Sequence, residues 1–244
     1  EPRKHILVVD DNADIRAYLG SWLGKYYQVS SAANGKEGLE TARREVPNLV
    51  LTDVMMPVMD GLELCRLLKS DMATSHIPVL LLTARDMDES RADAYKSGAD
   101  GYIVKPFNEE VLLARVKNLI DSRQHLRSLF GNEPDHKDQN KQDRKFTDKL
   151  REAIQRHLGD SGFSVEQLGG ELGLSRVQLY RKVKAMTGQS PVEILREARL
   201  RRADRLLATT EKTVAEIAYE VGFSSPSYFT KCYKDFFGRA PKYN

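Results

Sequence analysis

The chain has 244 residues, of which 41% are apolar and 30% are charged, as in a globular protein of one large or two ordinary domains. No stretch approaches the roughly 20 consecutive apolar residues that a membrane helix needs, and the first residues do not read as a signal peptide. Cys65 and Cys232 lie far apart in the sequence, which favours two reduced thiols, and we therefore expect a cytoplasmic protein.

The net charge of +3 is distributed unevenly along the chain. The formal charge is −3 over residues 1–123, +1 over residues 124–145 and +5 over residues 146–244. This asymmetry predicts different partners for the two ends, and it makes the basic end a candidate for binding nucleic acid.

The first half of the sequence alternates apolar runs with helical patterns. Strands are expected at residues 5–9, 27–33, 49–53, 77–82 and 101–104, and helices at residues 12–22, 35–45, 61–70, 88–97 and 108–120. Strands that alternate with helices predict a doubly wound α/β fold, in which a five-stranded parallel sheet carries helices on both faces.

Polar residues follow four of these strands directly. Asp10 and Asp11 end the first strand, Asp53 the third, Thr83 the fourth and Lys105 the fifth. Because the carboxyl ends of parallel strands meet at one edge of a sheet, the three carboxylates should lie together, where they repel one another unless a cation compensates. Mg2+ prefers carboxylate oxygens, and a lysine and a hydroxyl suit phosphoryl oxygens, so the set predicts phosphoryl transfer with an aspartate nucleophile.

In order and spacing, these residues resemble the receiver domain of two-component response regulators. The resemblance covers residues 4–123 and rests on Asp10-Asp11, on Asp53 followed by Met55, Pro57 and Gly61, and on Thr83-Ala84, Tyr102 and Lys105-Pro106. It implies that Asp53 accepts a phosphoryl group from a histidine kinase, and that Asp11, Asp53 and the Met55 carbonyl hold Mg2+ with help from Asp10. It also implies that Lys105 contacts the phosphoryl group, that Thr83 and Tyr102 form a switch, and that the Lys105–Pro106 peptide is cis.

A phosphatase of the haloacid dehalogenase type is an alternative, since that family also combines an Asp nucleophile with Mg2+, Thr and Lys. Its members have an Asp-x-Asp motif at the end of the first strand. Here the first strand ends in Asp10-Asp11 and the lone Asp53 follows the third strand, so the receiver is the preferred interpretation.

Residues 124–145 are rich in charge and poor in apolar side chains, and we expect a linker there. The sequence from residue 146 onward is helical in pattern. Capping boxes at Ser164/Gln167 and Thr213/Glu216, followed by turns at Gly173 and Gly222, predict two helix-turn-helix units at about residues 164–186 and 213–237. A long helix from Pro191 joins them.

The second half resembles the AraC-type DNA-binding domain over residues 146–244, most specifically at residues 217–229 and 179–184. The resemblance implies that the second helix of each unit enters the major groove, at sites about 34 Å apart on one DNA face. The residues expected to contact DNA are Arg176, Gln178, Arg181 and Lys182 in the first unit, and Ser225, Ser227, Tyr228 and Lys231 in the second. Gly169-Gly170 departs from the family pattern, which predicts a softer first unit.

The two resemblances together predict a response regulator that controls transcription. Phosphorylation of Asp53 is expected to shift Thr83 and Tyr102, to alter the surface from Ser90 to Tyr102, and to promote a homodimer that binds promoter DNA. One alternative is that the chain is the C-terminal part of a hybrid sensor kinase, with a kinase domain of its own as phosphodonor.

Overall fold

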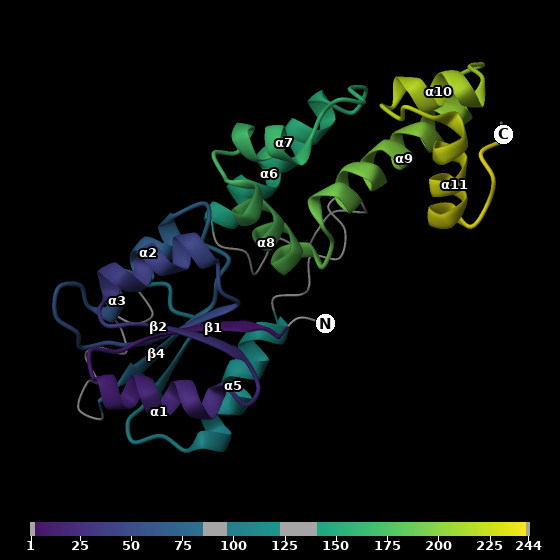
Figure 1. Cartoon of the computed structure of the whole chain (residues 1–244). Helices are drawn as coiled ribbons and strands as arrows, with labels where there is room; N and C mark the ends of the chain where they lie inside the picture. The colour runs from purple at the N-terminus through teal and green to yellow at the C-terminus, as the bar shows by residue number, and fades with distance from the viewer. Residues whose placement is uncertain (1–2, 85–96, 123–140, 243–244) are drawn as a thin grey trace. The chain divides into compact units, whose positions relative to one another are not determined.

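The computed structural model describes residues 3–84, 97–122 and 141–242 (Figure 1). These residues form two compact units, which we describe separately. The sheet unit is built from the first 127 residues, and the helical unit mainly from Lys145–Lys184 and Gly188–Asn244.

The sheet unit alternates strands and helices as the sequence predicts. Its strands are β1 (His5–Val9), β2 (Gln28–Ala32), β3 (Leu49–Asp53), β4 (Val79–Thr83) and β5 (Gly101–Val104), and its described helices are α1 (Ala13–Leu23), α2 (Gly35–Glu45), α3 (Gly61–Ser70) and α5 (Glu109–Ser122). The strands form one parallel sheet in the order β2-β1-β3-β4-β5. The predicted fold class is therefore confirmed, while the helix predicted over residues 88–97 lies almost wholly outside the described residues.

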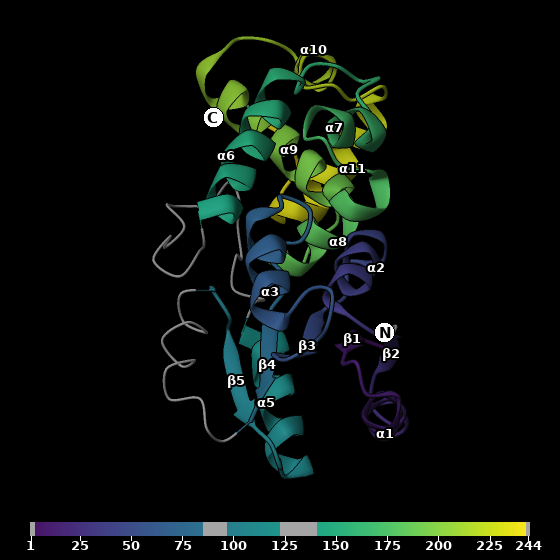
Figure 2. The ribbon, with the colours of Figure 1, turned by 90° about the vertical axis from the view of Figure 1, so that its left-hand side faces the viewer.

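Alternate residues of the central strands supply two separate cores. In β1, Leu7 and Val9 pack with α2 and α3 on one face of the sheet, whereas Ile6 and Val8 pack with α1 and α5 on the other. Figures 1 and 2 show these two helix layers on opposite sides of the strands. A strand buried on both faces needs a continuous apolar run, and this requirement explains the composition of β1, β3 and β4.

The fourth strand starts two residues later than predicted. The run from Ile77 is apolar, but Pro78 has no N–H to donate, and the ladder with β3 begins at Val79, opposite Val50. The strand extends instead through Thr83, so that the predicted hydroxyl lies on the last strand residue.

The helical unit contains α6 (Lys141–Arg156), α7 (Val165–Glu171), α8 (Arg176–Thr187), α9 (Pro191–Thr209), α10 (Val214–Glu220) and α11 (Pro226–Phe237). Helix α6 begins five residues before the predicted end of the linker, because Lys141–Lys145 is rich in good helix formers and continues the helix as a polar first turn. The rest of the predicted linker lies outside the described residues. None of the described helices is long and apolar enough to cross a membrane.

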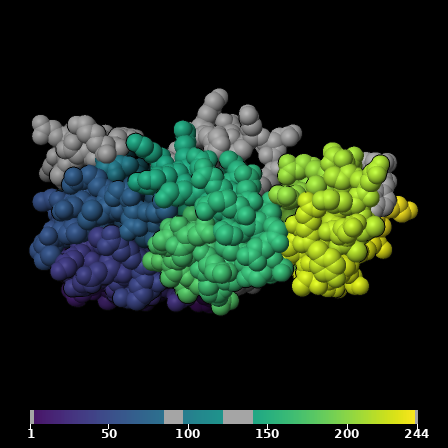
Figure 3. Space-filling view, turned by 90° about the horizontal axis from the view of Figure 1, so that it is seen from above, coloured from purple at the N-terminus to yellow at the C-terminus, as the bar shows by residue number. Residues whose placement is uncertain are grey.

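Two helix pairs, α7 with α8 and α10 with α11, have the predicted helix-turn-helix form. Capping boxes begin α7 and α10, and Gly173 and Gly222 adopt positive φ in the two turns. The second half of α9 packs its Leu200, Ala203 and Leu207 against α10 and α11 in one apolar core. The surface of these last helices is drawn in yellow-green and yellow in Figure 3.

Candidate functional site

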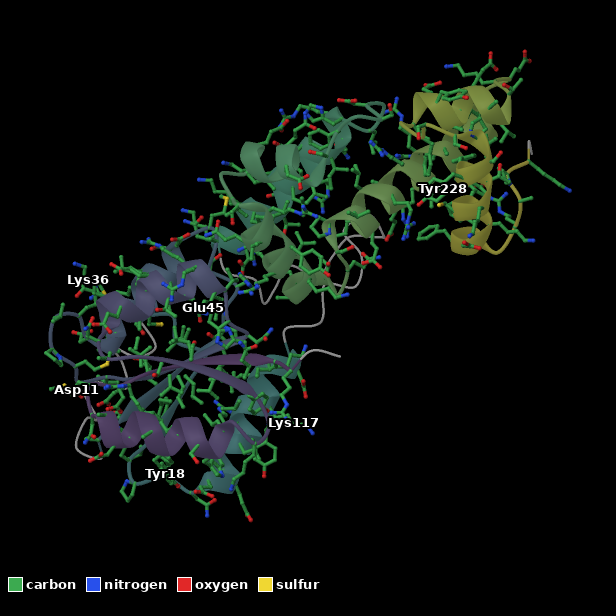
Figure 4. The ribbon with its side chains drawn as sticks, in the orientation of Figure 1. Asp11, Tyr18, Lys36, Glu45, Lys117 and Tyr228 are labelled. Atoms are coloured by element: carbon green, nitrogen blue, oxygen red, sulfur yellow. The ribbon has the colours of Figure 1, made fainter. Side chains whose placement is uncertain are left out.

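The predicted acidic residues meet at the carboxyl edge of the sheet. Asp10, Asp11 and Asp53 each offer a carboxylate oxygen, and these oxygens all lie within 4.8 Å of one another. In Figure 4, Asp11 lies at this end of the sheet, beside the start of α1. The strand register explains the convergence, since β1 lies next to β3, and β3 next to β4.

Asp10 is the innermost of the three carboxylates. Its residue is fully buried, its Oδ1 accepts a hydrogen bond from the Asn12 amide at 2.9 Å, and its Oδ2 lies 3.0 Å from the Lys105 ammonium. Asp11 is exposed, so it can receive a ligand from solvent. The pair therefore supplies one fixed and one accessible carboxylate.

Asp53 lies between a cation and a backbone donor. Its Oδ2 is 3.2 Å from Lys105 Nζ, its Oδ1 accepts from the Val54 amide at 2.9 Å, and its side chain is 15% exposed. Burial raises the pKa of Asp53, the Lys105 charge opposes that rise, and the Asp10 charge adds to it. Lys105 thus bridges two carboxylates that would otherwise repel each other.

Arg16 is a contributor that sequence reasoning missed. From α1 its Nη1 donates to the main-chain oxygens of Asp10 at 2.7 Å and Asp11 at 3.0 Å. The guanidinium therefore ties the end of β1 to the first turn of α1. The available signal was its position five residues after Asp11, where a long side chain on α1 can reach back over the helix start.

The remaining predicted residues occupy the positions that their strands dictate. Thr83 is half-buried and donates to the Ala84 carbonyl at 3.2 Å, and Tyr102 is half-buried on β5 against the core of α2 and α3. The Lys105–Pro106 peptide is cis, as the resemblance implied. Met55 follows β3 with its side chain 65% exposed, and the role of its carbonyl remains a prediction.

The predicted DNA-contacting residues of the helical unit differ in how far they are exposed. Arg176, Arg181, Ser227, Tyr228 and Lys231 are exposed, and Figure 4 labels Tyr228 on α11. Gln178 and Ser225 are half-buried, because the Gln178 side chain accepts from the Ser175 amide and the Ser225 hydroxyl accepts from the Tyr228 amide. The Arg176 guanidinium pairs with Glu166 at 2.9 Å, so its head is already engaged.

Lys182 lacks the exposed surface that the predicted DNA contact requires. Lys182 is fully buried, and its ammonium lies 4.7 Å from the centre of the Phe146 ring on α6. The neighbouring residue Arg181 is exposed. A step of one residue rotates a side chain by about 100° around the helix, so adjacent basic residues can lie on opposite faces.

Val177 and Tyr180 are two large side chains of α8 that lie on its surface. Val177 is 51% and Tyr180 47% exposed. The buried stripe of α8 is Leu179, Val183 and Met186, at spacings of four and three residues, and the two exposed residues fall off that stripe.

Comparison with known families agrees with this geometry. Residues 6–117 match the response regulator receiver domain, and residues 168–243 match a helix-turn-helix domain. The chain therefore combines a response regulator receiver domain with a helix-turn-helix domain, which is the architecture that the two sequence resemblances predict.

Several known proteins are similar to this chain. Histidine kinase P4 of Formosa agariphila is 38% identical over 240 residues, which cover 97% of this chain and 18% of that protein. Response regulator PleD of Caulobacter vibrioides is 45% identical over 115 residues, which cover 47% of this chain and 25% of that protein. The solved signal receiver domain of a histidine kinase from Syntrophus aciditrophicus covers 49% of this chain and 91% of its own, at 35% identity and a TM-score of 0.47. The chain thus spans a quarter or less of the length of these two curated relatives.

Proposed function

We propose that this chain is a transcription regulator whose DNA binding is switched by phosphorylation of Asp53. The observation that carries the proposal is the convergence of three carboxylates and Lys105 at the carboxyl edge of the sheet. A helix-turn-helix domain in the same chain supplies the output.

The three carboxylates fit Mg2+ as a resident ion. Hard divalent cations prefer oxygen ligands, and three acidic side chains within 4.8 Å of one another are a costly arrangement unless a cation neutralises them. Asp11 and Asp53 would hold the ion with Asp10 in support, and the Met55 carbonyl would complete the protein ligands. When bound, the ion neutralises charge between the carboxylates and an incoming phosphoryl group.

The chain's own residues would then carry out the transfer. A carboxylate oxygen of Asp53 attacks the phosphorus of a phosphohistidine, the new O–P bond forms as the donor N–P bond breaks, and the imidazole leaves. When Asp53 is phosphorylated, Lys105 loses part of its interaction with the Asp53 carboxylate and contacts the phosphoryl oxygens instead. The Thr83 hydroxyl donates a hydrogen bond to the same phosphoryl group, and the Tyr102 side chain on the adjacent strand shifts with it.

The switch would act on the assembly state. Movement of the Thr83 and Tyr102 side chains would alter the predicted surface from Ser90 to Tyr102. Of this surface, residues 97–102 lie within the described part of the chain and residues 90–96 lie outside it. Dimerisation there places two DNA-binding domains on one DNA, and the second then binds at a high effective concentration.

The test is Mg2+-dependent phosphorylation of the full chain by acetyl phosphate, measured by intact mass and followed by a sizing column. We expect one phosphoryl group on the native chain and none on Asp53→Asn, with a shift toward dimer in the labelled sample. Asp14→Asn, an exposed aspartate on α1 outside the cluster, is the matched control and should label normally. Labelling of Asp53→Asn to the native extent would refute the assignment.

A second arrangement has one observation in its favour. Nearly the whole chain aligns with a segment that makes up 18% of Histidine kinase P4. The same two domains can therefore serve as the output end of a longer sensor kinase, with the phosphodonor in the same polypeptide. Sequencing the gene upstream of Glu1 distinguishes the two arrangements, and neither changes the role proposed for Asp53.

A further inference from the structure

Three segments of the helical unit meet at one side chain, Arg199 of α9. Its Nε donates to the Leu158 carbonyl at 3.3 Å and its Nη2 to the Asp160 carbonyl at 2.5 Å, both in the turn that follows α6. A Cβ on Gly222, in the turn between α10 and α11, would lie 2.9 Å from Arg199 Nε and 2.5 Å from the Leu158 oxygen. The guanidinium therefore lies where the turn after α6, the long helix α9 and the turn of the second helix pair come together.

The turn after α6 is fixed to the first helix pair. The His157 ring stacks on the Phe163 ring with the centroids 4.0 Å apart, and its Nε2 lies 2.6 Å from the carboxylate of Glu171, the last residue of α7. Phe163 is buried and directly precedes Ser164, the N-cap of α7. Because the turn is attached at both ends of α7, it should move with the first helix pair as one body.

The same turn approaches the second helix pair closely, main chain to main chain. A Cβ on Gly159 would lie 3.0 Å from the Glu220 carbonyl oxygen, so glycines on both sides, Gly159 and Gly222, permit the approach. Carbonyl oxygens that are crowded in this way need donors, and a guanidinium offers five N–H groups in a planar fork. Burial lowers the pKa of Arg199 and the Asp160 charge opposes that change, so the guanidinium is partly withdrawn from water at this junction.

We infer that Arg199 is a positioning residue that holds the two helix-turn-helix units at one spacing on DNA. Helix α9 connects the units along the chain, and the Arg199 junction adds a second connection, from the turn after α6 to the turn before α11. Two connections fix a relative orientation that a single connection leaves free to rotate. Grooves on one DNA face recur about every 34 Å, so a fixed orientation suits one separation of the two DNA segments. The inference rests on the proposed DNA binding, and it gives Arg199 no contact with a base.

The first measurement needs no DNA and no phosphodonor. Spin labels are attached to the full chain at Gln155→Cys on α6 and Asp235→Cys on α11, two exposed positions, while the natural thiols of Cys65 and Cys232 are buried. Pulsed electron paramagnetic resonance then gives the distribution of distances between the labels. We expect one narrow distribution in the native background and a distribution roughly twofold wider in Arg199→Gln, because the lost junction frees a hinge motion.

Two further variants separate orientation from charge and from folding. Arg199→Lys keeps the charge and most of the stem but lacks the planar fork, so it should fold and still give the wide distribution. Arg205→Gln is the matched control, because Arg205 is an exposed arginine further along α9, and its distribution should stay narrow. Far-UV circular dichroism should show native helix content in all variants, so that a wide distribution reports orientation.

The second measurement uses the full chain with Mg2+ and acetyl phosphate, and a duplex selected from a pool with a random core. Base pairs that lose their effect in Arg181→Ala or in Lys231→Ala mark the segment bound by each unit. One base pair inserted between the segments separates them by about 3.4 Å and rotates one by roughly a tenth of a turn. The insertion should weaken native binding and Arg205→Gln roughly tenfold or more, since one unit loses its contacts, and Arg199→Gln by less than about threefold.

The outcomes separate this inference from the proposed function. A pool that yields no enriched sequence contradicts the DNA-binding function, and the label distances still test the junction. Distributions of equal width in the native chain and both Arg199 variants overturn the positioning role. A wider distribution with an unchanged insertion penalty overturns the role in DNA spacing. A penalty in Arg205→Gln as small as in Arg199→Gln does so too, because the effect would then belong to any arginine of α9.

Discussion

The sheet unit and the helical unit place their functional side chains by different means. In the sheet unit, topology decides: parallel strands end at one edge, so Asp10 and Asp53 both reach Lys105 although they come from different strands. In the helical unit, rotation about a helix axis decides, and the neighbours Arg181 and Lys182 have opposite surroundings. A site at strand ends can therefore be predicted even when the strand bounds are wrong by a residue. A site on a helix face cannot, because an error of one residue changes which side chains face outward.

The two helix pairs of the helical unit extend this comparison, because they share a motif but differ in their turns. Four residues, 172–175, separate α7 from α8, and five residues, 221–225, separate α10 from α11. The helix before the shorter turn, α7, has Gly169 where the helix before the longer one, α10, has Ala218. Substitutions at the glycines of these turns and helices should therefore have different effects on stability in the two pairs.

The largest expected effect is on the turn of the second pair. A Cβ on Gly222 would lie 2.5 Å from the Leu158 carbonyl oxygen, whereas a Cβ on Gly173 would meet nothing within 4 Å, although both residues have positive φ. We expect Gly222→Ala to cost about 3 kcal/mol of unfolding free energy and Gly173→Ala about 1 kcal/mol. Urea unfolding followed by far-UV circular dichroism measures both. Trp22, the single tryptophan, lies in the core of the sheet unit and serves as the control. Because both glycines belong to the helical unit, the urea midpoint measured by Trp22 fluorescence should be the same in both variants as in the native chain. Equal losses for the two variants would contradict the steric difference.

The adjacent basic residues of α8 should separate binding from stability. Arg181→Ala is expected to lower affinity for the selected duplex by about 2 kcal/mol and to relax preference at one base pair, without a loss of stability. Lys182→Ala should instead lower the unfolding free energy, since it removes a buried side chain that packs over Phe146, and leave base preference unchanged. Binding isotherms on native and single-base-variant duplexes check the pair. A change of base preference in Lys182→Ala would show that Lys182 does contribute to DNA recognition.

Arg16 should affect Mg2+ binding although it contacts only main-chain oxygens of Asp10 and Asp11 and none of the carboxylates that would hold the ion. Loss of its hydrogen bonds to the Asp10 and Asp11 carbonyls frees the loop that carries both carboxylates, and we expect Arg16→Ala to weaken Mg2+ binding roughly tenfold. Isothermal titration with Mg2+ alone, without a phosphodonor, measures this. Arg43→Ala is the control, because Arg43 pairs with Asp71 away from the cluster. Native affinity in Arg16→Ala would mean that the loop holds its shape without the arginine.

The smallest expected effect concerns the glycine pair of α7. Gly170 has open space around its Cβ position, so Gly170→Ala should raise stability by about 0.5–1 kcal/mol. A Cβ on Gly169 would lie 2.8 Å from the Leu174 carbonyl oxygen, so Gly169→Ala should lower stability despite the better helix former. Opposite signs in urea unfolding would show that one glycine weakens α7 and the other permits its short turn. Stabilisation by both changes would contradict the close approach.

Much of the sheet unit follows from local rules that the sequence displays directly. Apolar runs ending in Asp10, Asp53 and Thr83 specify both the strands and the edge where their ends meet. The contribution of Arg16 could not be predicted in the same way, because a side chain that donates to main-chain oxygens leaves no motif. In the helical unit, caps and turns were predictable from Ser164, Thr213 and the turn glycines. The exposure of Val177 and the burial of Lys182 depend on how α8 rotates against its neighbours, which is a property of packing.

The central claim is that a phosphoryl group on Asp53 controls DNA binding, and the most direct measurement is the affinity of the full chain for its selected duplex with and without that group. The chain is treated with Mg2+ and acetyl phosphate, the extent of labelling is measured by mass, and binding is titrated beside Asp53→Asn. We predict that labelling tightens binding of the native chain and makes the isotherm steeper, as expected for a dimer, while Asp53→Asn is unaffected by the phosphodonor. Complete labelling of Asp53 with no change in affinity or steepness would contradict the account.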